Sequence, residues 1–335
     1  IQMEELRMKK RLLAALCAAT MLTLTACGGG ASTDTNPDSS NSSEDSALTI
    51  GMVVNSAGAD TYQTTYYSTA RAYAKELGIN LQLLDPAGDA TKQQNQVQDL
   101  IGMKCDAIVV WPVNSEQAVA SVKAINEAGI PVMTTNTNVV KQGEQYLKCY
   151  VGPYNVQEGK LSAQQMVKDI GNDAKIVVID YMSGYSSSDE RHEGMMQGIE
   201  GTNIEVLDSQ PGEANREKSQ QVMENYLVKY PKGSINAVFC FDDNSAVGAI
   251  NAIEAAGRDD VKVYAAAAGD YGTVEVVKSG KLAGVAMQSP ITDARTALDY
   301  AVKIAKGEEI AEFYNYIDTP VATPENIDSL GIEKW

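Results

Sequence analysis

The sequence predicts an α/β protein built from two doubly wound lobes with Rossmann-like parallel sheets. From Leu48 onward, short apolar runs alternate with stretches of helical periodicity, a pattern typical of βαβ units and parallel strands. The alternation begins again near Asn155, so two halves of similar size follow each other along the chain. Without its N-terminal segments the chain keeps roughly 290 residues, which is enough for two domains of ordinary size.

The first half contains five apolar runs that predict strands and three amphipathic stretches that predict helices. Gly78 follows the first of these helices and is a typical helix stop signal. The predicted strands cover 48–54, 81–84, 107–111, 132–135 and 146–151, and the predicted helices cover 61–77, 90–103 and 115–128.

The second half repeats this pattern and adds one more strand at its end. The predicted helices cover 155–170, 189–200, 215–230, 245–256, 272–278 and 291–306, and the predicted strands cover 175–180, 204–208, 237–241, 261–266, 282–287 and 311–317. Ligands of doubly wound sheets bind beyond the carboxyl ends of the strands. Two such ends facing each other form a cleft, which is a preferred place for a small molecule.

Residues 1–27 have the organisation of a secretory signal that ends at Cys27. Lys9, Lys10 and Arg11 precede an uncharged run rich in Leu and Ala, and residues 1–7 before Met8 do not belong to the signal. The run is shorter than the roughly 20 residues that a spanning helix needs. Leu24-Thr25-Ala26-Cys27 resembles the lipobox of bacterial lipoproteins, in which the cysteine is lipidated. The alternative is an ordinary signal peptide with a chance cysteine.

Residues 28–47 are rich in Gly, Ser, Thr, Asn, Asp and Pro, which predicts a disordered tether between the anchor and the first strand. The formal net charge of the chain is −17. A chain this acidic is not attracted to nucleic acid or to anionic lipid by its charge.

Cysteine and histidine usage excludes most metal and acid–base chemistry. Cys105, Cys149 and Cys240 remain after the signal, and their spacing is not that of a metal site. Each lies in or beside an apolar run, which favours buried free thiols, although a Cys149–Cys240 disulfide stays open. His192 is the single histidine. The sequence therefore predicts neither a metal nor a cofactor.

Five segments between Leu48 and about Ile317 have a distinctive order and spacing. They are TIGMVVNSAGADTYQTTYYSTARAYAKELG, QVQDLIGMKCDAIVVWPVNSEQAVASVKAINEAGIPVMTTN, DERHEGMMQGI, NAVFCFDDNSAVGAINAIEAAG and GKLAGVAMQSP. Together they resemble the type I periplasmic binding proteins, particularly their ribose- and galactose-binding branch. The resemblance implies an extracytoplasmic protein, lipid-anchored to the cell membrane through Cys27, that closes two hinged lobes over a sugar or a sugar-like molecule. It also implies delivery of this ligand to an ABC permease and a monomeric state.

The resemblance also divides the chain into lobes that exchange segments. The final helix is expected in the N-terminal lobe and the last strand in the C-terminal lobe. The implied ranges are 48–152 with 290–317 for the N-terminal lobe, 153–289 with 318–335 for the C-terminal lobe, and hinge crossings near 151–155, 288–291 and 316–319.

In the first lobe, the family's ligand-binding positions fall on Asp60, Tyr62, Gln63, Trp111 and Asn136. The resemblance implies that Tyr62 stacks on the ligand and that Asp60 accepts a hydrogen bond from it. An ordinary surface turn around Tyr62 is the alternative. Trp111 ends a strand, and its alternative is a packed core side chain. Asn136 can bond a hydroxyl, because an amide both donates and accepts.

In the second lobe, the family's positions fall on Arg191, Asp242 and Gln288. The guanidinium fork of Arg191 can hold two oxygens at once; the alternative is a helix-surface arginine paired with Glu190 or Glu193. Asp242 follows the strand AVFCF, and Gln288 precedes a hinge crossing, where a purely structural amide is its alternative. Asp243, the residue after Asp242, is expected to cap the helix that follows it.

The chain departs from the family pattern at two positions. Asn136-Thr137 stands where the ribose branch has an Asp-Arg pair, which argues against ribose itself. Ala266-Ala267 stands where the family usually has Phe-Asp, so the cavity should be roomier and should lack one carboxylate. Asp270 or Tyr271 could supply the lost group from nearby.

Other classes of function find less support in the sequence. No phosphate-binding loop, nucleophile elbow or metal cluster is recognisable, so we expect no enzyme. A repressor with the same lobes would need a DNA-binding segment where the signal and the tether lie. A lipoprotein that presents its ligand to a membrane receptor has the same sequence features as a transport protein, and this alternative stays open.

Overall fold

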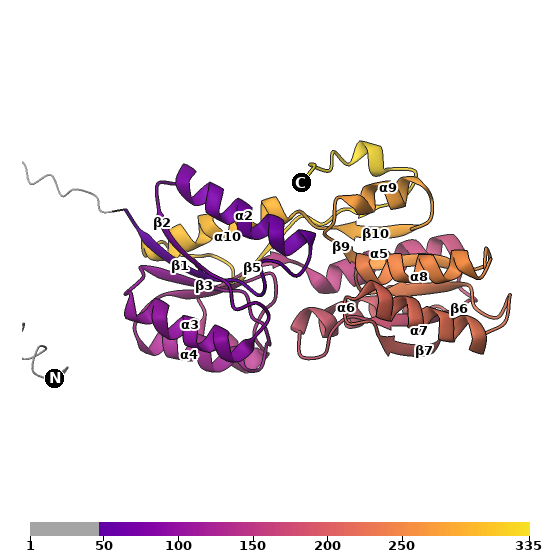
Figure 1. Cartoon of the computed structure of the whole chain (residues 1–335), viewed down its shortest axis with the longest axis horizontal. Coiled ribbons are helices and arrows are strands. Elements are labelled where there is room, and N and C mark those ends of the chain that lie inside the picture. Colours follow the sequence, from indigo (N-terminus) through magenta and orange to yellow (C-terminus); the bar gives the residue numbers. More distant parts are fainter. Residues whose placement is uncertain (1–46) are drawn as a thin grey trace, which may run out of the picture. The chain divides into compact units, whose positions relative to one another are not determined.

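The computed structural model describes residues 47–335 of the chain. The predicted signal segment, the anchor Cys27 and all but the last residue of the predicted tether lie outside the described residues. Two six-stranded sheets, each covered by helices on both faces, make up the described part (Figure 1). This architecture confirms the fold class predicted from the alternating pattern.

The first lobe contains the chain up to β5 together with α10 and β11. Its elements are β1 (Thr49–Val53), α2 (Thr61–Glu76), β2 (Asn80–Leu84), α3 (Ala90–Gly102), β3 (Ala107–Val110), α4 (Ala118–Glu127), β4 (Val132–Thr135), the 3₁₀ helix η1 (Lys141–Tyr146), β5 (Tyr150–Pro153), α10 (Pro290–Ala305) and β11 (Tyr314–Ile317).

The second lobe contains the chain from α5 to β10 together with the C-terminal residues. Its elements are α5 (Asn155–Ile170), β6 (Lys175–Asp180), α6 (Ser186–Ile199), β7 (Glu205–Pro211), α7 (Arg216–Lys229), β8 (Ala237–Cys240), α8 (Asp243–Ala255), β9 (Lys262–Ala268), α9 (Gly272–Lys278), β10 (Gly284–Met287), β12 (Val321–Ala322) and the 3₁₀ helix η2 (Ile327–Ser329).

The strand orders of the two sheets correspond to each other. The first sheet has the order β11-β5-β4-β3-β1-β2 and the second the order β12-β10-β9-β8-β6-β7. All pairs are parallel except β10 with β12. Because the first sheet is entirely parallel, its strands end at one edge, and the side chains that follow β1, β3 and β4 come together there.

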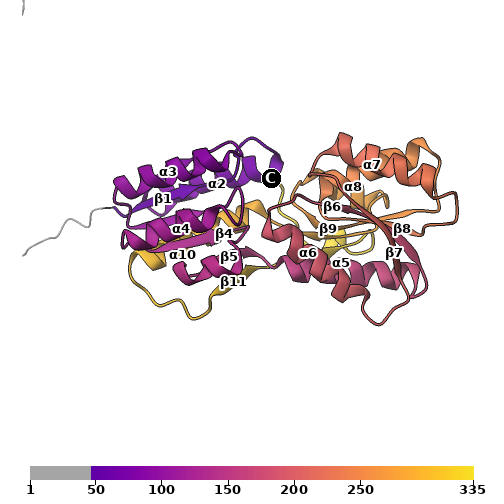
Figure 2. The same ribbon diagram turned by 90° about the horizontal axis from the view of Figure 1, so that it is seen from below.

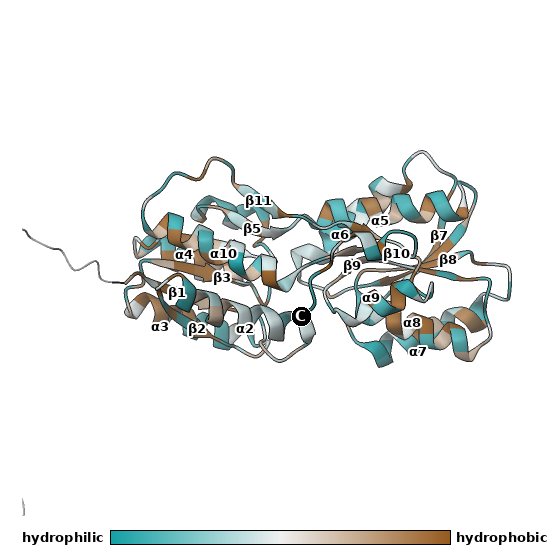
Figure 3. Ribbon diagram, turned by 90° about the horizontal axis from the view of Figure 1, so that it is seen from above, coloured by the Kyte–Doolittle hydropathy of each residue, from teal (hydrophilic) through white to brown (hydrophobic). Residues whose placement is uncertain are grey.

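Each sheet has an apolar core on both of its faces, as the continuous apolar runs predict. In β1, Ile50 and Met52 pack toward α2 and α10, whereas Val53 packs toward α3 and α4. The second sheet is covered by α7, α8 and α9 on one face and by α5 and α6 on the other. Figure 2 shows these helix layers from below. In Figure 3 the strands β3 and β8 are mainly hydrophobic, whereas the helices carry hydrophilic bands.

The chain passes between the two sheets three times, after β5, after β10 and after β11. The aromatic rings of Tyr154 and Tyr316 stack 4.2 Å apart and join the first crossing to the third. The strand predicted over 311–317 is β11 of the first sheet, so the last strand of the second lobe is instead the two-residue β12. The residue ranges predicted for the lobes stay a prediction.

Several predicted elements were wrong in their bounds. The strand predicted over 311–317 starts at Tyr314, and the helix predicted to start at Asp189 begins at Ser186. The strand predicted over 146–151 starts only at Tyr150, because η1 extends to Tyr146 and residues 147–149 are irregular. The helix predicted to start at Ser115 begins at Ala118, because the Asn114 side chain accepts the backbone N–H groups of Glu116 and Gln117 in a turn.

Cys105, Cys149 and Cys240 are buried free thiols, which confirms the reading that the sequence favoured. Burial raises the pKa of the Cys149 thiol to about 12, so this thiol stays protonated at neutral pH. Among the described helices, none combines the length and the apolar character that crossing a bilayer requires.

Candidate functional site

A cavity of about 660 Å³ lies between the carboxyl ends of the two sheets. Both lobes line it, and the strand-to-helix loops of each sheet supply its polar side chains. All eight side chains predicted to bind the ligand are among its lining residues: Asp60, Tyr62, Gln63, Trp111, Asn136, Arg191, Asp242 and Gln288. The contact of each residue with a ligand stays a prediction.

Tyr62 and Trp111 form an aromatic wall on the first-lobe side of the cavity. Their rings meet edge to face, with centroids 6.0 Å apart. The Tyr66 ring also packs against Trp111, with 4.9 Å between the ring centroids. Tyr62 is 9% exposed and Trp111 5%. Both side chains therefore belong to the core and also line the cavity. Trp111 is thus a packed core side chain, and its contact with a ligand stays a prediction.

The side chains of Asp60 and Gln63 form hydrogen bonds within the loop between β1 and α2 and in the first turn of α2. Asp60 is the N-cap of α2, and its Oδ1 accepts the backbone N–H of Gln63 at 2.7 Å. The Gln63 amide accepts the N–H of Ser56 at 2.8 Å and donates to Asp60 Oδ2 at 3.2 Å. Each of these side chains keeps lone pairs for a further donor, because a carboxylate has about four acceptor sites and an amide oxygen has two.

Asn136 and Tyr62 are held by a buried acid, Asp293, that the sequence did not indicate. Asp293 Oδ2 accepts the Tyr62 hydroxyl at 2.8 Å and Asn136 Nδ2 at 2.8 Å, and Asn136 Nδ2 also lies 3.1 Å from the Tyr62 hydroxyl. Asn136 has a left-handed backbone, with φ of 60°, which an asparagine tolerates better than most residues. Burial raises the pKa of Asp293 to about 7, although both hydrogen bonds oppose this shift.

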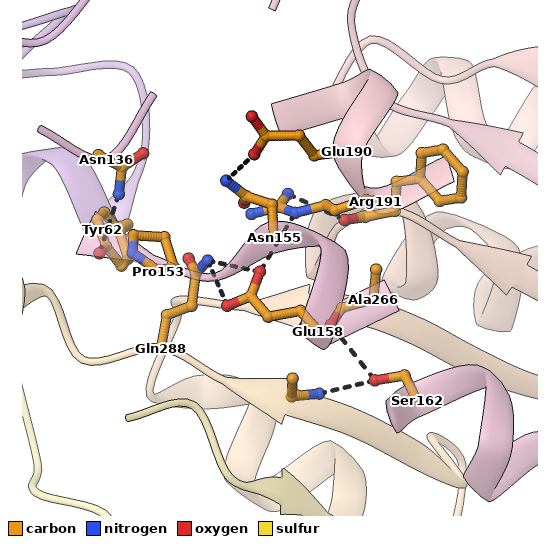
Figure 4. A network of polar contacts seen from close by, with 12 residues as sticks. Tyr62, Asn136, Pro153, Asn155, Glu158, Ser162, Glu190, Arg191, Ala266 and Gln288 are labelled. Atoms are coloured by element: carbon orange, nitrogen blue, oxygen red, sulfur yellow. Dashed lines mark hydrogen bonds and ion pairs between the residues drawn. The ribbon is translucent and has the colours of Figure 1, made fainter. Parts of the chain in front are cut away.

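Arg191 and Gln288 are held by a second buried acid, Glu158, in the other lobe (Figure 4). Gln288 Nε2 donates to Glu158 Oε1 and Oε2 at 2.8 and 3.0 Å, and Arg191 Nε lies 3.4 Å from Oε2. The Arg191 guanidinium also donates to the carbonyl of Phe241 and lies over the Tyr181 ring. Burial raises the pKa of Glu158, and Arg191 opposes that shift. Arg191 is thus buried and paired with Glu158, not with Glu190 or Glu193 on its own helix.

The two acids occupy corresponding positions in the fold. Glu158 is the fourth residue of α5, which follows the first crossing, and Asp293 is the fourth residue of α10, which follows the second. Both side chains are completely buried. One signal for Glu158 was available: helical periodicity places it on the same face as Ser162 and Met166, both of which are buried.

The predicted helix cap at Asp243 was wrong, and the neighbouring residue has that role. Asp242 is the N-cap of α8, because its Oδ1 accepts the N–H of Ser245 at 2.9 Å. Asp243 instead accepts the backbone N–H groups of Gly269 and Asp270 at 3.0 and 2.9 Å. Burial, and after it the Asp242 carboxylate, raises the pKa of Asp243 to about 6.

The alanines that replace the family's Phe-Asp pair are split between core and cavity. Ala266 packs in the core of the second lobe, and Ala267 lines the cavity without offering a polar group. Asp270 lines the cavity nearby, where Arg216 Nη2 lies 3.6 Å from its Oδ2. Tyr271 is not among the lining residues, since its ring packs against Trp335.

Direct contacts between the lobes join residues that line the cavity. Asn55 Nδ2 donates to the Tyr185 hydroxyl at 2.9 Å, and the Thr61 hydroxyl donates to Asp270 Oδ2 at 3.3 Å. Gly269 approaches the Tyr62 ring so closely that a Cβ there would lie 2.2 Å from Cδ2. The two lobes are therefore in direct contact at several residues that line the cavity.

Residues 50–309 match the family model described as a periplasmic binding protein domain. The chain belongs to this family. It is 32% identical over 269 residues to the ribose import binding protein of Escherichia coli, an alignment that covers 79% of this chain and 88% of the relative.

Solved structures agree with the family assignment. An ABC transporter solute binding protein from Bacillus halodurans, with bound myo-inositol, has a TM-score of 0.78 at 30% identity and covers 86% of this chain and 98% of its own. A periplasmic solute binding protein from Actinobacillus succinogenes, with bound D-allose, has a TM-score of 0.76 at 26% identity, covering 84% and 99%.

Proposed function

We propose that this protein is an extracytoplasmic solute-binding protein that captures a sugar or a sugar-like polyol between its lobes and delivers it to an ABC importer. The observation that carries this proposal is the cavity between the lobes, which an aromatic wall and side chains able to hydrogen-bond hydroxyl groups line together. Aromatic rings pack on the C–H faces of a sugar ring, and buried amides and charged groups bond its hydroxyls. The polyols named for the relatives support this class of ligand, and a family of binding proteins supports a role other than catalysis.

Binding is best tested on residues 48–335, purified and titrated calorimetrically with ribose, D-allose, myo-inositol, galactose and their amino derivatives. We expect at least one of them to bind and to raise the melting temperature through linkage. Arg191→Ala should abolish the binding. Arg295→Ala is the matched control, because Arg295 lies on the first lobe's surface beside Tyr73 and outside the cavity. Binding that survives in Arg191→Ala would refute the placement of the site.

We further propose that Cys27 anchors the protein to the outer face of the cell membrane and that the protein acts as a monomer. The basic start, the short apolar run and the lipobox-like residues support the anchor. Expression with Cys27→Ser should release the protein from the membrane fraction, and mass spectrometry should find acyl chains only on the unchanged chain. A Cys27→Ser protein that stays in the membrane fraction to the same extent would exclude this anchor.

A further inference from the structure

The cavity carries many more negative than positive side chains. Two arginines line it, and both already have carboxylate partners, Arg191 in Glu158 and Arg216 in Asp270. Glu213 is likewise paired, with Lys218. The lining carboxylates are Asp60, Glu213, Glu217, Asp242, Asp243 and Asp270.

Four of these carboxylates, Asp60, Glu217, Asp242 and Asp243, have no ion-pair partner within residues 47–335. Glu217 is exposed to solvent, whereas the other three are at least partly buried. Asp60 and Asp242 are the N-caps of α2 and α8, and Asp243 is the first residue of α8. The partial positive charge of a helix N-terminus balances about half an elementary charge, so two helix ends do not neutralise three carboxylates.

Negative charge from the two lobes converges at one aromatic ring. Asp60 comes from the first lobe and Asp242 from the second, and both line the same cavity as Tyr181. Burial and then these two carboxylates raise the pKa of Tyr181, whereas the Arg191 guanidinium, which lies over the ring, lowers it. The lobes therefore bring like charges into one cavity, and a further positive group there would reduce their repulsion.

Hydrogen-bond capacity points to the same chemistry. A carboxylate only accepts, and Asp60 and Asp242 each keep acceptor sites beyond the bonds that cap their helices. An ammonium group supplies three donors and no acceptor, whereas a hydroxyl adds acceptors of its own. Arg191 is the complementary element, because it is 6% exposed and lines the cavity. Its Nε faces Glu158 Oε2 at 3.4 Å, so the Nη groups are the donors that remain for a ligand oxygen.

A metal ion does not account for this charge. No set of three or more acidic, histidine or cysteine side chains in the described chain is arranged to hold a metal. Positive charge can instead enter the cavity with the organic ligand. Resting on the proposed function, we propose that the ligand is an amino-substituted sugar or polyol, whose ammonium group binds between Asp60 and Asp242 while its hydroxyls bind Arg191.

Matched ligand pairs test this proposal on residues 48–335 by calorimetry at pH 7. The pairs are glucosamine with glucose, galactosamine with galactose, and mannosamine with mannose, and the N-acetyl form of each amine keeps the nitrogen without its charge. We expect an amine to bind at least 10-fold more tightly than both neutral forms. Neutral sugars that bind as tightly as their amines would overturn the proposal and leave the sugar-binding function intact. If no member of any pair binds, both proposals lose their support.

Two variants locate the effect. Asp60→Asn and Asp242→Asn remove one charge each but keep an N-cap, since asparagine caps helices as well as aspartate does. Each should reduce the ratio of amine affinity to neutral-sugar affinity about 10-fold, whatever its effect on the neutral sugar itself. Asp89→Asn is the control, because Asp89 caps α3 in the same manner but lies outside the cavity. An unchanged preference in both cavity variants would refute the assigned position of the ammonium group.

Discussion

The two lobes solve the same structural problem with different chemistry. In each, an acid on the fourth residue of the helix after a crossing orients two side chains of the cavity. Glu158 in the second lobe faces a guanidinium, whereas Asp293 in the first lobe faces only an amide and a phenol. The first lobe therefore keeps a buried acid whose charge depends on pH, and the second lobe keeps a buried ion pair.

Removing Glu158 should produce the largest loss of stability. Glu158→Ala leaves the Arg191 guanidinium buried without its counter-charge, and breaking such a pair from one side costs about 3–5 kcal/mol. Urea unfolding measures this loss. Glu190→Ala is the control: Glu190 bonds only Asn155 at 2.9 Å, so its loss should cost about 1 kcal/mol. Equal losses of unfolding free energy in both variants would mean that the Glu158–Arg191 pair stabilises the protein no more than the Glu190–Asn155 hydrogen bond does.

Asp293 should make stability fall as the pH rises. Its pKa of about 7 in the folded protein exceeds the value near 3.9 of an exposed aspartate, so the folded state binds the proton more tightly. Stability conferred by this proton is complete below about pH 4 and is lost up to about pH 7, with a slope approaching 1.4 kcal/mol per pH unit. Asp293→Asn should remove this contribution.

The comparison of the two curves isolates Asp293, because Glu158 and Asp243 contribute to the slope of both proteins alike. Urea unfolding of each protein at pH 5, 6, 7 and 8 gives the difference. Parallel curves over this range would show that Asp293 does not titrate there.

A methyl group on Gly269 should hinder closure and leave each lobe intact. A Cβ there would meet the Tyr62 ring of the other lobe at 2.2 Å, and such overpacking costs about 1–3 kcal/mol. Gly269→Ala should therefore bind the best sugar of the calorimetric panel about 10- to 100-fold more weakly. Gly58→Ala, where a Cβ meets nothing within 4 Å, serves as the control. Unchanged affinity in Gly269→Ala would contradict the closed arrangement of the lobes.

The smallest expected effect concerns the phenol that Asp293 holds. Tyr62→Phe removes the hydroxyl that donates to Asp293 at 2.8 Å and accepts from Asn136 Nδ2 at 3.1 Å, and it should cost about 1–2 kcal/mol of unfolding free energy. A double-mutant cycle with Asp293→Asn should give a coupling of similar size, since the two side chains are in contact. Additive losses would place the Tyr62 hydroxyl elsewhere.

The sequence by itself determined the alternation of strands and helices, because apolar runs and helical periodicity are local properties. The resemblance to a family predicted more of the site than any single local pattern did. It selected Arg191, Asp242 and Gln288 by their positions in motifs, and all three line one cavity. Local reasoning failed at the start of α8, where the cap falls on Asp242 and not on Asp243, because the helix begins at Asp243 and not at Ser245 as predicted.

Only the tertiary structure decided how those side chains are held. Glu158 and Gln288 are 130 positions apart in the chain, and Tyr62 and Asp293 are 231 apart. From the sequence alone, a polar residue on a helix is expected to face solvent. Glu158 and Asp293 are buried because the chain crosses between the lobes and brings other elements against their helices. The charge balance of the cavity has the same origin, because each carboxylate becomes part of it only when both lobes contribute their strand ends.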